Sequence, residues 1–176
     1  MVIKHTNPCG VATGASAAEA YVRAREADPL SAFGGIVGLN RPIDAETAKA
    51  LTGTFIEAVI APGIDDPAAV LAILAAKPNL RVVTASFDGV SPRDVRTILG
   101  AWLVQAADRV TEAHVAWPAG AEPKVVTRRA PSADEWAALR FAWRVCAHVK
   151  SNTILFASPT ATLAIGAGQM SRVDAV

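Results

Sequence analysis

Near its N-terminus the chain carries the stretch Val2-Ile3-Lys4-His5-Thr6-Asn7-Pro8-Cys9-Gly10. The apolar Val2-Ile3 pair predicts the end of a buried strand, and Asn-Pro followed by Gly predicts a turn directly after the Lys-His pair. Open α/β sheets bind their ligands outside the carboxyl ends of strands, which is where such a turn places Lys4 and His5. Two interpretations fit: a pair of proton-handling side chains at a ligand site, or the solvated end of a strand.

Length and composition predict a globular protein. The chain has 176 residues, of which 52% are apolar and 19% charged, which is enough for one domain with its own core. A formal net charge of +1 gives no electrostatic basis for binding nucleic acid or a membrane surface. No apolar run approaches the ~20 residues of a membrane span, and no leader opens the chain, so we expect a cytoplasmic protein.

Short apolar strands alternate with helices after the opening stretch. Residues 36–39, 55–61 and 80–84 are expected to be strands, and residues 30–35 a loop. Helices are expected over residues 16–28, 44–52 and 66–76, the first beginning at Ser16 and the other two capped by Asp44 and Asp66. This alternation predicts an α/β fold with a sheet covered on both faces.

The pattern is weaker between residues 85 and 124 and returns at Ser132. Residues 95–104 fit either a strand pair or one long strand, and residues 108–123 a hairpin or a loop. Ser132 and Glu135 form a capping box that starts a helix. Strands are expected over residues 153–157 and 162–165, and another helix near Ser171. One stripe of the helix predicts core positions, Trp143 and Cys146 among them, rather than cofactor contacts: Trp136, Leu139, Trp143, Cys146 and Val149.

Three features of the predicted elements have two interpretations each. Gly166-Ala167-Gly168 with Arg172 fits an anion site at a helix start, or a structural turn. Glu57, inside an apolar strand, faces water at a sheet edge or contacts a ligand donor such as a ribose hydroxyl. Asn152 caps the backbone between a helix and a strand, or binds a substrate amide.

Other catalytic arrangements lack necessary residues. Cys9 and His5 have no third group that would orient a thiol nucleophile. His114 and His148 have no partner at helical spacing, so we expect no metal site. A zinc deaminase needs a Pro-Cys-x-x-Cys sequence, and Pro8-Cys9 is not followed by that second cysteine.

Six motifs in order resemble the AICAR transformylase part of the AICAR transformylase/IMP cyclohydrolase family. The resemblance covers nearly the whole chain and is weakest over residues 85–124. The motifs are Lys4-His5-Thr6-Asn7-Pro8-Cys9-Gly10, Asp28-Pro29-Leu30-Ser31-Ala32-Phe33-Gly34-Gly35, Asn40-Arg41-Pro42, Ile60-Ala61-Pro62-Gly63, Val149-Lys150-Ser151-Asn152 and Gly166-Ala167-Gly168-Gln169-Met170-Ser171-Arg172-Val173-Asp174.

The resemblance implies a three-layer α/β/α sandwich of the cytidine-deaminase-like type without zinc. It implies formyl transfer from 10-formyltetrahydrofolate to the 5-amino group of AICAR, giving FAICAR in de novo IMP biosynthesis, with no metal. Full-length members of the family are homodimers whose active sites form between two subunits. AICAR and folate are therefore the expected partners, with neither nucleic acid nor membrane.

The resemblance also assigns roles to individual residues. His5 matches the residue that takes the proton as the amine attacks, and Lys4 the residue that stabilises the oxyanion of the formyl group. Asn152 matches the residue that orients the substrate carboxamide. Four further residues match substrate contacts, to the folate, the nucleotide, the ribose and the phosphate respectively: Phe33, Gly34, Glu57 and Arg172.

The chain departs from the family in extent. It begins inside a predicted strand and stops about one turn into a predicted helix, so we expect a fragment, residues 1–176 forming a single partial transformylase domain. The IMP cyclohydrolase domain, the segment before Lys4 with a phosphate-binding arginine, and the C-terminal half of the transformylase are absent. An inactive nucleotide-binding or structural fragment is the alternative function, and a metal-dependent deaminase a distant third.

Overall fold

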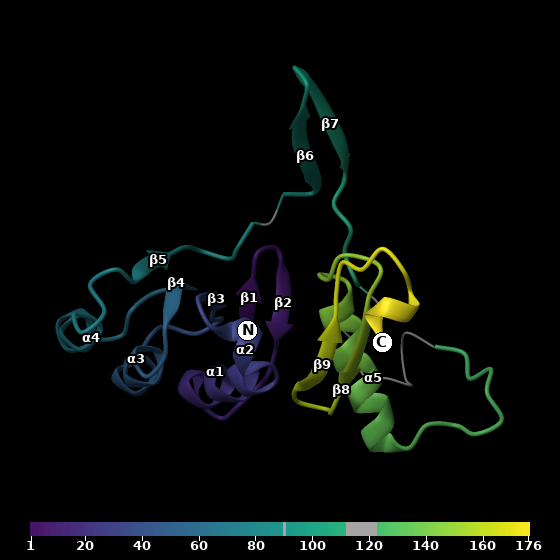
Figure 1. Ribbon diagram of the computed structural model, residues 1–176, viewed down its shortest axis with the longest axis horizontal. Helices are drawn as coiled ribbons and strands as arrows, with labels where there is room; N and C mark the ends of the chain where they lie inside the picture. Colours follow the sequence, from purple (N-terminus) through teal and green to yellow (C-terminus); the bar gives the residue numbers. More distant parts are fainter. Residues whose placement is uncertain (90, 112–122) are drawn as a thin grey trace.

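The computed structural model describes residues 1–89, 91–111 and 123–176 and is built around a five-stranded mixed sheet (Figure 1). The strand order is β2-β1-β3-β4-β5. β1 is antiparallel to both of its neighbours, whereas β3, β4 and β5 are parallel to one another. The strands are β1 (Val2–Lys4), β2 (Asn7–Gly10), β3 (Gly35–Gly38), β4 (Ile56–Ala61) and β5 (Arg81–Thr84).

β1 and β2 form a hairpin with a two-residue loop. Lys4 pairs with Asn7, which leaves His5 and Thr6 as the loop. The turn predicted over Asn7–Gly10 is therefore wrong, because the chain reverses earlier and this segment is β2. Pro8 is tolerated there because β2 lies at the edge of this sheet, where a missing N–H leaves fewer bonds unmade.

The first helices begin where the capping residues predict. Ser16, Asp44 and Asp66 each accept a backbone N–H three residues further on. They start α1 (Ala17–Glu26), α3 (Ala45–Thr52) and α4 (Pro67–Leu74). The loop expected over residues 30–35 is replaced in part by a short helix, α2 (Pro29–Ala32), because Asp28 caps it and Pro29 suits its first position.

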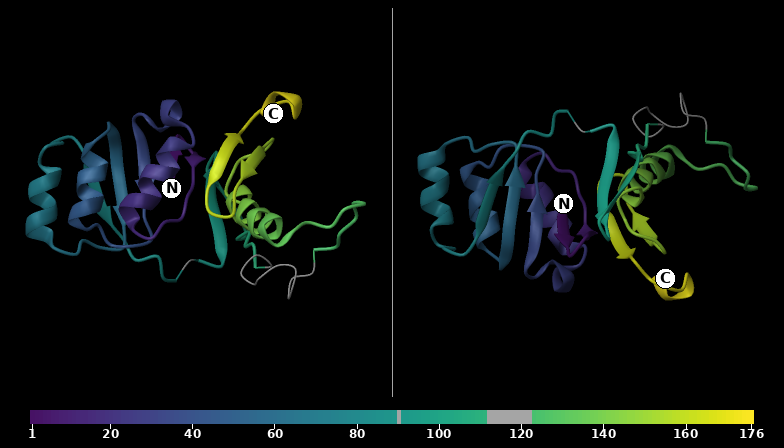
Figure 2. Two further views of the ribbon diagram at one scale, coloured as in Figure 1. Left: turned by 90° about the horizontal axis from the view of Figure 1, so that it is seen from below. Right: turned by 90° about the horizontal axis from the view of Figure 1, so that it is seen from above.

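Helices α1, α3 and α4 lie side by side on one face of the sheet, as both views of Figure 2 show. Crossovers between parallel strands are right-handed in nearly all proteins, so helices that follow strands added in one direction fall on the same face. The opposite face carries Ile36 and Val83, which are 39% and 46% exposed. The cover predicted for both faces is thus present on one face among the described residues. The mixed sheet and its helices confirm the α/β class and are consistent with a three-layer sandwich; the cytidine-deaminase-like detail stays a prediction.

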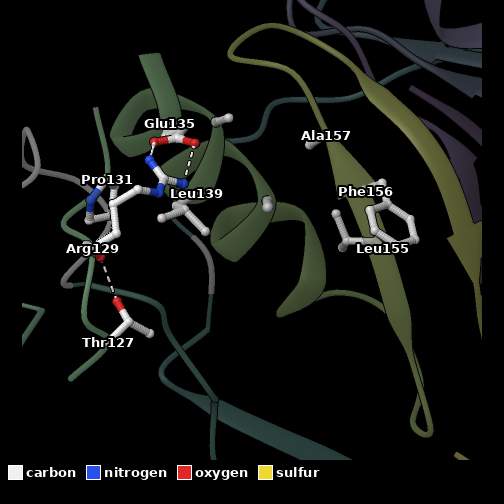
Figure 3. A pocket seen from close by; sticks show the side chains of 10 residues that line it. Thr127, Arg129, Pro131, Glu135, Leu139, Leu155, Phe156 and Ala157 are labelled. Carbon is white, nitrogen blue, oxygen red and sulfur yellow. Dashed lines mark hydrogen bonds and ion pairs between the residues drawn. The ribbon is translucent and has the colours of Figure 1, made fainter. Parts of the chain in front are cut away.

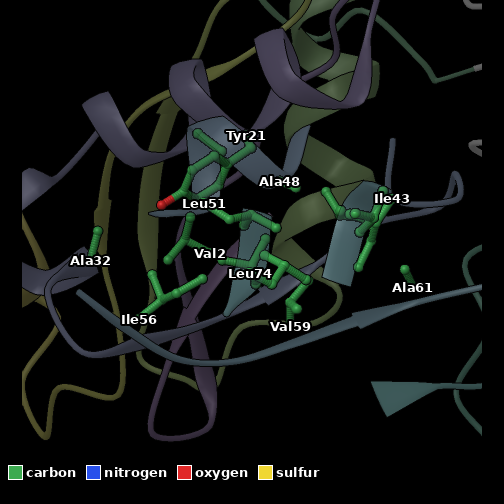
Figure 4. Packing of buried hydrophobic residues seen from close by; sticks show 14 residues of the cluster. Val2, Tyr21, Ala32, Ile43, Ala48, Leu51, Ile56, Val59, Ala61 and Leu74 are labelled. Carbon is green, nitrogen blue, oxygen red and sulfur yellow. The ribbon is translucent and has the colours of Figure 1, made fainter. Parts of the chain in front are cut away.

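The main core lies between this sheet and its three helices (Figure 4). Tyr21, Ile43, Leu51 and Val59 have no exposed surface, and the Tyr21 hydroxyl hydrogen-bonds Thr54 Oγ1 at 2.7 Å. Truncating a buried leucine such as Leu51 to alanine typically costs about 2–5 kcal/mol. This core fixes the strands whose ends carry the candidate site.

A hairpin stands off the body of the protein (Figure 1). It consists of β6 (Arg93–Ile98) and β7 (Ala101–Ala106), which confirms the strand pair expected as one possibility for residues 95–104. Leu99 and Gly100, the two residues between the strands, both have positive φ. Residues 112–122, with His114 and most of the predicted loop 108–123, lie outside the described part.

The last third of the described chain packs a helix on a second hairpin. Its elements are α5 (Ala133–Cys146), β8 (Ile154–Ala157), β9 (Thr162–Gly166) and a short 3₁₀ helix, η2 (Val173–Ala175), which replaces the helix expected near Ser171. The capping box of α5 is confirmed. The predicted core stripe is wrong at Trp143, which is 50% exposed, and at Cys146, which is exposed, because α5 packs chiefly on β8. Trp136 and Val149 of the same stripe are half-buried.

Hydrogen bonds join this second hairpin to the edge of the main sheet. Thr162 N–H donates to the Val11 carbonyl (2.9 Å), and Thr13 N–H donates to the Thr160 carbonyl (2.8 Å). β9 therefore lies beside β2 and brings the chain beyond Gly166 to the hairpin loop that carries His5. Across the described residues, no helix has the length and apolar character needed to cross a membrane.

Candidate active site

Lys4 ends β1 and is held by a neighbouring loop. Its Nζ donates hydrogen bonds to the carbonyl oxygens of Phe33 (2.7 Å) and Gly34 (3.2 Å). An ammonium group has three N–H donors, so a third remains for a ligand. The loop thus gives the Lys4 charge a fixed position instead of leaving it at the end of a mobile side chain.

The loop that holds Lys4 is itself fixed by β4. Gly34 N–H donates to the carbonyl of Phe55 (2.9 Å), and the Phe33 and Phe55 rings lie 5.2 Å apart. Lys4 lies at the carboxyl end of its own strand, as expected. However, β1 is antiparallel to β3, so the site is at the amino ends of β3 and β4, and the rule for parallel sheets does not explain its location.

His5 follows Lys4 at the tip of the hairpin. Its φ is 56°, a left-handed value that is uncommon for a residue other than glycine. Its side chain is exposed. Strained backbone of this kind occurs often at functional sites, where it directs a side chain that a regular strand would turn away. Lys4 and His5 are therefore adjacent groups that both remain accessible to a ligand.

Asn152 lies in the loop before β8 and holds a second loop. Its Nδ2 donates to the carbonyls of Gln169 (3.1 Å) and Met170 (3.2 Å). This supports the backbone-capping interpretation. Both bonds use the amide N–H groups, so Oδ1 is the side-chain atom that can accept a hydrogen bond from a ligand.

Asn152 and Arg172 line the same cavity, which has a volume of about 220 Å³. A Cβ on Gly166 would collide with the carbonyl of Ala175, so glycine is needed for η2 to lie against β9. This supports the structural interpretation of that glycine. The cavity is lined by Asn152, Thr153, Ile154, Arg172 and Ala175.

Glu57 is directed outward by a β-bulge. Gly35 pairs with Ile56 and Ile36 pairs with Ala58, so Glu57 is the extra residue of β4. Its carboxylate binds Arg81 of β5 at 2.8 Å. Glu57 therefore faces solvent near the Phe33–Phe55 contact, and the sequence pattern gave no sign of its pairing with Arg81.

Asn7 links the two halves of the site and was not predicted. Its Oδ1 accepts a hydrogen bond of 2.9 Å from the backbone N–H of Lys150. The two residues are 143 positions apart, and no local sequence pattern reports such a contact. The structure thus brings Lys4 together with Phe33 and Gly34, and Asn152 together with Arg172, and joins the two groups through Asn7.

The thiol nearest Lys4 is unsuited to act as a nucleophile. Burial raises the pKa of Cys9, and the Asp28 carboxylate raises it further. Among residues 1–89, 91–111 and 123–176, no cluster of three or more His, Cys, Asp or Glu side chains could hold a metal ion.

A larger cavity, of about 390 Å³, lies between α5 and β8 (Figure 3). Arg129 binds both carboxylate oxygens of Glu135 at its rim, each at 2.7 Å, and lowers the pKa of Glu135 to about 2. None of the predicted site residues lines this cavity.

Comparison with known proteins places the chain in a family. The model of the family described as AICARFT/IMPCHase bienzyme matches residues 1–176. The chain is 51% identical over 176 residues to the bifunctional purine biosynthesis protein PurH of Synechococcus elongatus, covering 99% of this chain and 33% of that protein. It is 52% identical over 173 residues to PurH of Trichormus variabilis (98% and 33%), and 50% identical over 186 residues to PurH of Anaeromyxobacter dehalogenans (100% and 34%). The chain spans about a third of the length of these relatives, and it belongs to the AICARFT/IMPCHase bienzyme family.

Proposed function

We propose that the chain forms part of the site for formyl transfer from 10-formyltetrahydrofolate to the 5-amino group of AICAR. The observation that carries the proposal is Lys4, fixed by the carbonyls of Phe33 and Gly34 directly beside an exposed His5. An immobilised cation next to an imidazole suits acyl transfer to an amine, because the cation stabilises the developing oxyanion and the imidazole accepts a proton. Membership of the family supports the substrate assignment.

The two side chains have complementary roles in this reaction. The AICAR amine attacks the formyl carbon, forming a C–N bond, and the third N–H of Lys4 stabilises the oxygen as it becomes negative. His5 accepts the proton that the amine loses. The bond between the formyl carbon and N10 of the folate then breaks, and that proton leaves with tetrahydrofolate, so atoms and charge balance without a metal.

The other residues bind the nucleotide and folate. We assign the AICAR phosphate to Arg172, the carboxamide to Oδ1 of Asn152, and the ribose hydroxyls to Glu57. Phe33 lies beside Lys4, where its ring can contact the folate, and the Gly34 backbone contacts the nucleotide. We further propose that the full-length protein is cytoplasmic, forms a homodimer and also has IMP cyclohydrolase activity.

A second candidate is nucleotide binding without turnover. The cavity beside Asn152 and Arg172 measures about 220 Å³, whereas pockets for whole small molecules usually measure about 300–1,000 Å³. A cavity of this size suits part of a nucleotide, in line with a chain that holds only part of the site.

One assay separates the two candidates. The chain is mixed with AICAR and 10-formyltetrahydrofolate, and tetrahydrofolate release is followed for the wild type, Lys4→Ala and His5→Asn, each with and without a metal chelator. Turnover that survives the chelator and is lost in both variants supports formyl transfer. AICAR binding with no turnover in the wild type supports the second candidate. A wild-type chain that shows no binding and no turnover contradicts both candidates.

A further inference from the structure

Asn7 contacts both the strand that carries Lys4 and the loop that leads to Asn152. It pairs with Lys4 in the β1–β2 hairpin, so its backbone position is set by the sheet. Its side-chain Oδ1 accepts the N–H of Lys150, 143 residues away, at 2.9 Å. A short, rigid side chain on a fixed backbone thus determines where Lys150 lies.

Lys150 in turn positions Asn152 through a small network. The Lys150 carbonyl accepts the N–H of Gly168 (2.8 Å) and the hydroxyl of Thr153 (2.5 Å). Asn152 and Gln169 exchange backbone hydrogen bonds of 3.0 and 3.2 Å. A shift of Lys150 is therefore passed to Asn152 and to the loop that precedes Arg172.

Hydrogen bonds also join the segment after β2 to the start of β9, at the end of β9 opposite to Gly166. Thr13 binds Thr160 and Val11 binds Thr162, at the start of the strand. They hold the second hairpin to the sheet near the start of β9, about four residues from Gly166. The bond between Asn7 and Lys150 closes the end beyond Gly166, beside the hairpin loop that carries His5.

We propose that Asn7 is a positioning residue that aligns Asn152 and Arg172 with Lys4 and His5. The proposal rests on the proposed function, because it concerns the same site. Asn7 does not touch the reacting atoms and acts through Lys150. Removing the Asn7 side chain leaves every proposed catalytic and binding side chain present in the protein. It displaces one half of the site from the other. Misplacement of about 1 Å is enough to cost large factors in binding and rate.

The test compares Asn7→Ala with Asn7→Asp in the whole chain. Aspartate keeps an oxygen that accepts the Lys150 N–H, whereas alanine removes it. Asn7→Ser, whose hydroxyl is too short to reach Lys150, repeats the removal if Asn7→Ala does not fold. Asn40→Ala is the matched control, since Asn40 is exposed and lies beyond the carboxyl end of β3, away from Gly34.

Two quantities are measured on each variant: hydrogen exchange at the Lys150 and Asn152 amides, and AICAR affinity by calorimetry in high salt, which screens the charge that aspartate adds. We expect Asn7→Ala to speed exchange at both amides and to weaken AICAR binding about tenfold or more. Asn7→Asp should restore both, and Asn40→Ala should change neither.

The results separate this proposal from the proposed function. Unchanged AICAR affinity in Asn7→Ala overturns the positioning role, as does an Asn7→Asp variant that binds as weakly as Asn7→Ala. A wild type that binds no AICAR overturns the proposed function. In that case, hydrogen exchange at the Asn152 amide is the only test of the positioning role. Faster exchange in Asn7→Ala than in the wild type supports that role, and unchanged exchange overturns it.

Discussion

The Nζ of Lys4 lies 3.2 Å from the carbonyl oxygen of Gly34, and a Cβ placed on Gly34 would lie 3.2 Å from the same Nζ. A side chain on Gly34, the residue that helps to hold the ammonium group, would therefore displace that group by a few tenths of an ångström. Gly34 also has a φ of 66°, which glycine adopts readily and other residues adopt at a cost. One position thus combines a backbone requirement with a steric one.

Gly34→Ala should lower stability by about 1–3 kcal/mol, because alanine is strained at this positive φ. It should also displace Lys4 and reduce turnover or AICAR affinity. Gly63→Ala is the control, since a Cβ there meets no atom within 4 Å and its φ lies outside the positive range. Urea unfolding measures the stability of Gly34→Ala and of Gly63→Ala. Equal stabilities for the two variants would show that Gly34 has no special backbone requirement.

His5→Asn should abolish formyl transfer and leave the unfolding midpoint nearly unchanged. Asparagine tolerates the left-handed backbone that His5 adopts, with φ of 56°, but it cannot accept the proton from the amine. His5→Val is the opposite control, because a β-branched residue is strongly disfavoured at positive φ and should lower stability. Turnover by His5→Asn at the wild-type rate would show that another group takes the proton.

Glu57→Gln should remove the preference of the site for a ribose over a 2′-deoxyribose. The carboxylate, held by Arg81 at 2.8 Å, is the proposed acceptor for the ribose hydroxyls. Calorimetry with AICAR and its 2′-deoxy analogue measures this preference in the wild type and the variant. Stability should change little, about 0.5 kcal/mol or less, because the ion pair is exposed. A deoxy analogue that binds wild type as tightly as AICAR would argue against the ribose contact.

Asp44 should make α3 sensitive to acid. The backbone N–H of Thr47 lowers the pKa of the Asp44 carboxyl, so its folded value lies below the unfolded value of about 3.9. Its contribution to stability is present above the unfolded pKa and is lost as pH falls through the folded one.

Asp44→Asn should therefore lose less stability than the wild type between about pH 7 and pH 3, because asparagine caps without titrating. Asp44→Ala should lose about 1 kcal/mol at neutral pH, because no cap remains. Urea unfolding at the two pH values measures both effects. An identical acid loss in Asp44→Asn and the wild type would show that other carboxylates account for it.

Local sequence patterns were enough to predict the elements around the core. Capping residues such as Ser16 and Asp44, and the apolar run of β4, place helices and strands within a few residues of where they lie. The Lys4–His5 pair was found because it lies beside a strand end. These predictions succeed because each depends on interactions within a few residues.

Predictions that depend on distant contacts were less successful. The apolar stripe of α5 predicts core, but what covers it cannot be inferred from its own spacing, and Trp143 is half exposed. The direction of β1 against β3 and the bulge at Glu57 depend on strand pairing. The bond between Asn7 and Lys150 joins residues 143 positions apart, so only the folded chain shows it.

The proposed function requires that Arg172 and Asn152 hold a nucleotide beside Lys4 and His5. The most direct test is calorimetric titration of AICAR, and of the same nucleoside without its phosphate, into the wild-type chain and Arg172→Ala. We expect the wild type to bind the phosphorylated form more tightly and Arg172→Ala to bind the two forms alike. No binding of AICAR by the wild type, or an undiminished phosphate preference in Arg172→Ala, would contradict this requirement.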